Sequence, residues 1–153
     1  MADATGFERI SELQNEILGF TFEQIGEKVD KFYVEGKVTD DNGRITMVQG
    51  SVVFAVKDNN LLNNSDVLND EEYDSNSDFV LPRVEEIHDI LVELQGKSPV
   101  RFRWSVDTRT NQVESDWTYY DDLTAQEKKD DFWEHWQGDA LWREQLKAEL
   151  AGQ

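Results

Sequence analysis

The segment 32–57 constrains the fold of this chain more than any other, because its residues alternate in character. One side of its first stretch is apolar or small and the other is mostly polar: Phe32, Val34, Gly36 and Val38 against Tyr33, Glu35, Lys37 and Thr39. A period of two predicts a β-strand with one buried face. Asn42-Gly43 follows, and this pair tolerates the positive φ angles of a tight hairpin. The return strand, 44–57, changes its apolar phase near Gly50, where we predict a β-bulge.

A second pair of strands is predicted at 101–106 and 113–120. In the first of these strands Phe102, Trp104 and Val106 share one face, so we assign Trp104 to the core. Helices are predicted from apolar residues at helical spacing and from capping signals. They run from Phe7 to Gly19 or Gly26, from Pro82 to Gly96, and from the capping box Thr124–Glu127 to a break at Gly138, with a last helix starting at Asp139.

The resulting order, αββαββα, predicts one α+β domain over residues 1–153. Because each hairpin is joined locally, we expect a four-stranded antiparallel sheet with helices packed on one face. Residues 58–78 differ from the rest, since they hold seven acids, six Asn residues and no basic residue. Such a stretch buries too little apolar surface to offset its ordering entropy. We therefore predict an acidic, Asn- and Asp-rich loop at 58–78.

The net charge of −18 restricts the partners of this chain. An acidic surface repels phosphate backbones and anionic membranes, so we expect no direct binding to nucleic acid or membrane. A basic protein is the partner that such a field attracts, and a merely solubilising surface is the alternative. The sequence shows no signal peptide and no apolar run of roughly 18 residues, so a cytoplasmic location is the simplest expectation. The oligomeric state stays open.

Residue types that perform catalysis are few. Cysteine is absent, which excludes disulfides, thiolate metal sites and a thiol nucleophile. His88 lies among acids on a predicted helix and is interpreted as a surface residue, and His135 as a packing or interface residue. The acids of 70–78 alternate as in a calcium loop, but the Gly and Glu that an EF-hand requires are missing. We therefore expect no enzymatic activity, no cofactor and no metal.

Aromatic and acidic residues concentrate in the C-terminal half. All five tryptophans lie between Trp104 and Trp142. Aromatic residues are enriched at interface hot spots, although tryptophans that fill the core are the alternative. Asp121 and Asp122 are either partner contacts or charges that stabilise the next helix N-terminus. The predicted partner-binding residues are Asp116, Tyr119, Tyr120, Asp121, Asp122, Asp130 and Asp131, with a second group, Glu71, Glu72 and Asp74, in the 58–78 loop.

The C-terminal half also resembles a known family. The segments 100–107 (Val-Arg-Phe-Arg-Trp-Ser-Val-Asp), 113–117 and 118–122 (Thr-Tyr-Tyr-Asp-Asp) are similar to the YezG-like immunity, or antitoxin, proteins. In that family a Trp-containing strand leads through a turn to a strand that ends in a Tyr-Asp pair. A Trp-containing C-terminal helix follows, for which Trp133 and Trp136 are the counterparts. The resemblance covers 100–136 and, in outline, 7–57.

This resemblance implies a function. YezG-like proteins, like the immunity proteins of contact-dependent growth inhibition systems, bind and neutralise nuclease toxins. We therefore expect a tight 1:1 complex with a basic nuclease toxin domain, formed through an acidic surface. An acidic adaptor or nucleic-acid mimic that binds another basic protein is the alternative. The toxin and its substrate (RNA, tRNA or DNA) stay open, as does whether inhibition would block the active site.

Overall fold

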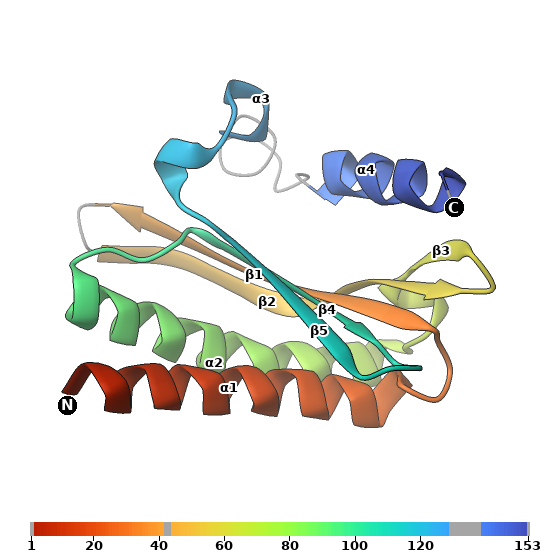
Figure 1. The fold of residues 1–153 in the computed structure, drawn as a ribbon, viewed down its shortest axis with the longest axis horizontal. Helices are drawn as coiled ribbons and strands as arrows, with labels where there is room; N and C mark the ends of the chain where they lie inside the picture. The colour runs from red at the N-terminus through yellow and green to blue at the C-terminus, as the bar shows by residue number, and fades with distance from the viewer. Residues whose placement is uncertain (1, 42–43, 129–138, 153) are drawn as a thin grey trace.

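The computed structural model describes residues 2–41, 44–128 and 139–152 of the chain (Figure 1). Long helices and an antiparallel sheet make up most of these residues, and short 3₁₀ helices follow two of the strands. In chain order the elements are α1 (Ala2–Ile25), β1 (Lys31–Asp41), β2 (Arg44–Lys57), β3 (Asn60–Asn63), η1 (Asn64–Asp66), α2 (Asp70–Gln95), β4 (Arg101–Asp107), β5 (Gln112–Thr118), η2 (Tyr120–Asp122), α3 (Ala125–Lys128) and α4 (Asp139–Ala151).

The sheet has five strands in the order β3-β2-β1-β4-β5, and every neighbouring pair is antiparallel. The predicted α+β class and both predicted hairpins are confirmed. The prediction of four strands in an αββαββα order is wrong, because β3 adds a fifth strand beside β2. This strand is short and pairs only with Phe54–Lys57, so composition alone did not reveal it.

Residues 58–78 do not form the predicted loop. Asp58 and Asn59 adopt positive φ angles of 51° and 63° and turn β2 back into β3. Asn69 then begins α2 with a capping box, in which its side chain accepts from the Glu72 N–H while the Glu72 carboxylate accepts from the Asn69 N–H. The helix therefore begins well before Pro82, which lies inside it. Local caps and acids in the first turn, which favour a helix N-terminus, account for the difference.

The β1–β2 register shifts at two places, opposite Val53 and Thr46 of β2, and neither is at Gly50. Tyr33 is opposite Phe54, whereas the next residue of β1, Val34, is opposite Val52. Gly50 pairs regularly with Gly36, and both glycines lie under α2. A Cβ at Gly36 would lie 2.7 Å from a methyl group of Val84. These glycines therefore let helix α2 approach the sheet closely.

Helices cover both faces of the sheet, which corrects the prediction that they pack on one face. In Figure 1 helices α1 and α2 lie below the sheet and α4 lies above it. Trp104 faces α1 and α2 and is 1% exposed, which confirms its assignment to the core. On the other face, α4 inserts Trp142 and Leu146 into a second apolar cluster, completed by Tyr33, Phe54 and Val56. His88, interpreted as a surface residue, is buried in α2.

Candidate functional site

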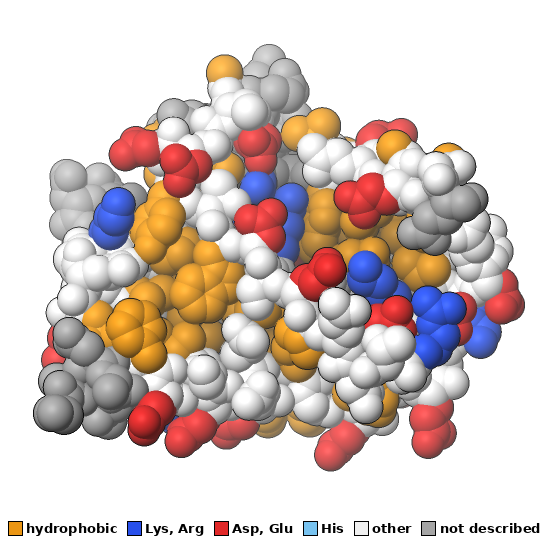
Figure 2. Space-filling model, in the orientation of Figure 1, with side chains coloured by type: hydrophobic (Ala, Val, Ile, Leu, Met, Phe, Trp, Pro, Cys, Tyr) orange, Lys and Arg blue, Asp and Glu red, His pale blue; other side chains and the backbone are white. Residues whose placement is uncertain are grey.

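The predicted partner-binding residues of 113–122 form a continuous surface, here called the β5 surface, which consists of β5 after Gln112 together with Tyr119 and η2. Four carboxylates are exposed on it: Glu114, Asp116, Asp121 and Asp122. Within the described part of the chain, these four carboxylates form no ion pair. Val113 and Tyr120 are also exposed, at 44% and 40%. Figure 2 shows carboxylates and hydrophobic side chains gathered on this face.

The two tyrosines of this surface have different environments. The Tyr119 hydroxyl accepts a hydrogen bond from the Gln95 amide, and the Lys97 ammonium lies 4.7 Å from the centre of its ring. Tyr119 therefore joins the β5 surface to the C-terminal end of α2. Tyr120 presents an exposed ring. Of the two consecutive tyrosines, Tyr120 is therefore the one available to a partner.

The capping interpretation of Asp121 and Asp122 can be tested against the geometry. The side chain of Thr124 accepts from the Glu127 N–H at 3.1 Å, and the Glu127 carboxylate accepts from the Thr124 N–H at 3.1 Å. The predicted capping box is thus confirmed, and it supplies the cap of α3. Asp121 and Asp122 belong to η2, which has no side-chain cap. Both carboxylates remain exposed and available to a partner.

The second predicted group lies elsewhere. Glu71 and Asp74 are exposed in the first turns of α2, and Glu72 belongs to the capping box there. Tyr119 contacts Gln95 at the opposite end of this helix. At 1.5 Å per residue, Glu71 and Gln95 are about 36 Å apart along the helix axis. The structure therefore separates the two groups. Asp130 and Asp131, like Trp133, His135, Trp136 and Gly138, lie outside the described residues.

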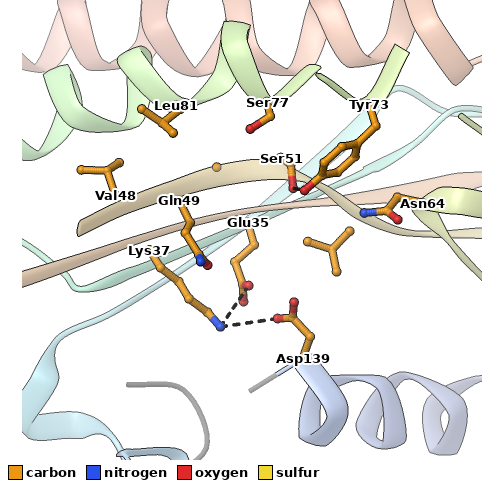
Figure 3. A pocket seen from close by; sticks show the side chains of 12 residues that line it. Glu35, Lys37, Val48, Gln49, Ser51, Asn64, Tyr73, Ser77, Leu81 and Asp139 are labelled. Atoms are coloured by element: carbon orange, nitrogen blue, oxygen red, sulfur yellow. Dashed lines mark hydrogen bonds and ion pairs between the residues drawn. The ribbon is translucent and has the colours of Figure 1, made fainter. Parts of the chain in front are cut away.

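A buried charge network, which the sequence analysis did not identify, lies on the sheet face under α4. It consists of Glu35, Lys37, Arg103 and Asp139 and is called the Glu35 network. Arg103 donates to one Glu35 oxygen at 2.7 Å, and the Lys37 ammonium lies 3.4 Å from the other. The same ammonium is 3.6 Å from the Asp139 carboxylate at the start of α4 (Figure 3). The alternation placed Glu35 and Lys37 on a solvent-facing side, but α4 covers that side.

The Glu35 network borders a cavity of about 330 Å³ at the edge of β2. Figure 3 shows Glu35, Lys37 and Asp139 on its α4 side, while Tyr73 and Ser51 meet on its α2 side. Both Glu35 oxygens are engaged by cations of the sheet, Arg103 on β4 and Lys37 on β1, and the Lys37–Asp139 ion pair links this network to α4. Arg103 also stacks on Trp142 at 4.1 Å, which adds to the attachment of α4.

This network predicts a pH dependence of stability. Burial raises the pKa of Glu35 from its ordinary value of 4.5 to about 7, against the effect of Lys37 and with a further rise from the Asp139 carboxylate. The folded state thus binds the proton more tightly than the unfolded state. The free energy of unfolding should fall as pH rises from about 4.5 to about 7, by at most about 1.4 kcal/mol per pH unit.

Urea unfolding between pH 5 and 7.5 measures this dependence. Glu35→Gln removes the titrating group, so its unfolding free energy should vary less over this range than that of the wild type. Equal pH profiles for the two proteins would show that Glu35 keeps an ordinary pKa in the folded state.

The described residues were also considered for a metal site and for a membrane-spanning helix. Among the described residues no group of His, Asp and Glu has the arrangement needed to hold a metal ion, and none of the helices is long and apolar enough to cross a membrane. Residues 70–78, considered above as a calcium loop, are helical. Compared with models of known protein families and with curated proteins, the chain gives no match.

Proposed function

We propose that this protein is an immunity protein that binds a basic nuclease toxin domain in a 1:1 complex through the β5 surface. The observation that carries the proposal is the combination, on that surface, of exposed apolar side chains and carboxylates that pair with no described residue. Between residues 113 and 127 the chain has five acids and no basic residue. Among the ion pairs of the described residues, Glu127 is the one of these five acids that takes part, with Arg101 at 2.7 Å.

Physical chemistry supports a nuclease as the partner. A nuclease needs a basic cleft to hold phosphates. Exposed carboxylates such as Asp116 and Asp121 attract such a cleft and accelerate association. Tyr120 and Val113 supply apolar area, which slows dissociation once water is excluded. The resemblance of 100–136 to YezG-like proteins points to the same role, which would be exercised in the cytoplasm.

A titration tests the proposal. The product of the gene directly upstream, which the proposal expects to be a nuclease, is assayed for nuclease activity with increasing amounts of the purified protein. We expect its activity to disappear near a 1:1 molar ratio, because inhibition is by binding alone. Full inhibition at strongly substoichiometric amounts would indicate catalysis and would overturn the proposal. Binding to a basic protein that has no nuclease activity would support the adaptor alternative instead.

Charge reversal of Asp121 and Asp122 to Lys should slow association with the nuclease about tenfold or more at low salt. The effect should shrink as ionic strength rises, because salt screens exposed charges. The thermal midpoint should stay nearly unchanged, since neither carboxylate caps a helix. Stopped-flow fluorescence and thermal melts measure the two quantities.

The matched control reverses the same number of charges at the far end of α2, at Asp74 and Asp78, which are both exposed. This control should associate nearly as fast as the wild type. If the Asp74 and Asp78 variant is the slow one, the interface lies at the N-terminal end of α2 and the β5 surface is not the binding face.

A further inference from the structure

The edge strand β5 has backbone groups whose direction follows from the hydrogen-bond ladder. The Val38 N–H donates to the Val100 carbonyl at 2.9 Å, so β1 and β4 are hydrogen bonded at this pair. Antiparallel ladders alternate between bonded and non-bonded pairs. Every second residue of β4 therefore directs its backbone hydrogen bonds to β1. These residues are Phe102, Trp104 and Val106, which lie opposite Gly36, Val34 and Phe32.

The intervening residues of β4 consequently direct their backbone hydrogen bonds to β5: Asp107, Ser105, Arg103 and Arg101. Their partners in the register are Gln112, Glu114, Asp116 and Thr118. The intervening residues of β5 direct their N–H and C=O groups away from the sheet: Val113, Ser115 and Trp117. The opposite edge confirms the alternation. There Val52, which is opposite Val34, points its N–H to Asn76 at 2.7 Å and its carbonyl to Asn64 at 3.0 Å.

The two edges of the sheet differ in how they are covered. At the β2 edge, side-chain amides and the short strand β3 occupy the outward groups. In the regions that the structure describes, no strand pairs with the outer side of β5. Residues 112–116 are all exposed, and β5 has neither a proline nor a register shift. An open, regular edge of this kind is a template for another strand.

The two faces of β5 specify what such a strand would carry. Glu114 and Asp116 lie on the face shared with Arg103, whereas Val113 and Trp117 lie on the face shared with the core residues of β4. An added strand places its side chains alternately beside these two faces. Basic residues would therefore lie next to Glu114 and Asp116, and apolar residues next to Val113 and Trp117.

We propose that the partner binds by adding an extended segment of alternating basic and apolar residues to the free edge of β5. This inference rests on the proposed function, since it assigns to the basic partner a binding mode at the same surface. A second copy of the chain does not fit this edge, because pairing β5 with itself would bring acids together across the new strand pair, which is unfavourable. Charge complementarity selects a basic segment.

Replacement of Ser115 tests the strand addition directly. Ser115→Pro removes an outward N–H and leaves the β4–β5 ladder intact, because the Ser115 N–H is not part of it; proline is tolerated at such edge positions. Ser115→Ala is the matched control, since it changes the side chain and keeps the N–H. The probe is a short synthetic peptide of alternating Lys and Val, and a peptide of the same composition with Lys and Val in separate blocks tests for binding by charge alone.

Backbone amide NMR of the ¹⁵N-labelled protein measures binding. The alternating peptide should shift the resonances of 112–118 and slow the exchange of the Val113 and Ser115 amides. Ser115→Pro should weaken this binding by about tenfold, the value of one hydrogen bond of about 1.4 kcal/mol. Ser115→Ala should bind like the wild type, and the block peptide should bind more weakly.

Equal binding of the peptide to the proline variant and to the wild type, or equal binding of both peptides to the wild type, would overturn the strand addition. The nuclease titration separates this failure from a failure of the proposed function. A proline variant that inhibits the nuclease with wild-type affinity refutes strand addition and leaves the immunity function standing. Absence of inhibition by the wild type refutes the function, whatever the peptide does.

Discussion

Replacing Glu35 by Ala is expected to lower the free energy of unfolding by about 3–5 kcal/mol. The Glu35 carboxylate is buried and accepts from Arg103 at 2.7 Å, while Lys37 lies 3.4 Å from its second oxygen. Its removal leaves two buried cations without this counter-charge. Uncompensated buried charges are among the most destabilising features of a folded protein, so the loss should far exceed that of an ordinary surface substitution.

Urea denaturation at pH 8, where Glu35 with its pKa of about 7 is mostly ionised, measures this loss, and Glu114→Ala on β5 is the matched control. Glu114 is an exposed acid on the same face of the sheet, and its removal should change the free energy of unfolding by less than about 0.5 kcal/mol. The Lys37–Asp139 ion pair and the apolar contacts of Trp142 do not involve Glu35, so α4 should stay attached to the sheet in the folded Glu35→Ala variant. Similar losses for the two variants would show that the Glu35 network contributes little to stability.

Trp104→Ala is the second substitution with a large expected effect, a loss of about 3–5 kcal/mol. Trp104 is 1% exposed, stacks on Phe102 with the ring centres 5.7 Å apart, and donates from its indole N–H to Gln14 at 2.9 Å. The substitution leaves a cavity between the sheet and the helices and removes the hydrogen bond to α1. Its unfolding midpoint in urea should fall sharply with an unchanged denaturant slope.

Trp104→Phe separates the two contributions. It keeps an aromatic ring in the core and loses the bond to Gln14, so its loss should be clearly smaller than that of Trp104→Ala. Equal losses for the two variants would assign the stability to the hydrogen bond rather than to packing. A small loss for Trp104→Ala would mean that the core can close around the missing ring.

Elements with local signals were predicted well. The β1–β2 hairpin followed from alternation and an Asn-Gly pair, and Asp41 is opposite Arg44 as such a hairpin requires. The capping box of Thr124 and Glu127 was also found, because both of its hydrogen bonds join residues three apart. By contrast, the start of α2 was missed, although Asn69 and Glu72 carry the same kind of signal. The acidic, Asn-rich composition of 58–78 was given more weight than this cap.

The candidate site was predicted only in part, because sequence reasoning identifies sites whose residues are close together in the chain. Asp116, Tyr119, Tyr120, Asp121 and Asp122 are near one another in the chain, so their common surface depended little on the rest of the fold. Glu71 and Asp74 were assigned to the same function on composition, and the length of α2 separates them from that surface. The Glu35 network was not predicted, because Glu35 and Arg103 are 68 residues apart.

The sequence by itself determined the α+β class, the two hairpins, the core position of Trp104 and the acidic character of the surface. These properties depend on the period of apolar residues, on local caps and on the sum of charges, and each can be evaluated from neighbouring residues. Only the tertiary structure decided that α4 covers the second face of the sheet, that Glu35 and Lys37 are buried there, and that no described strand pairs with the outer edge of β5. Burial and strand pairing depend on contacts between distant segments, and the alternation of a strand is the same whether its polar face meets water or another helix.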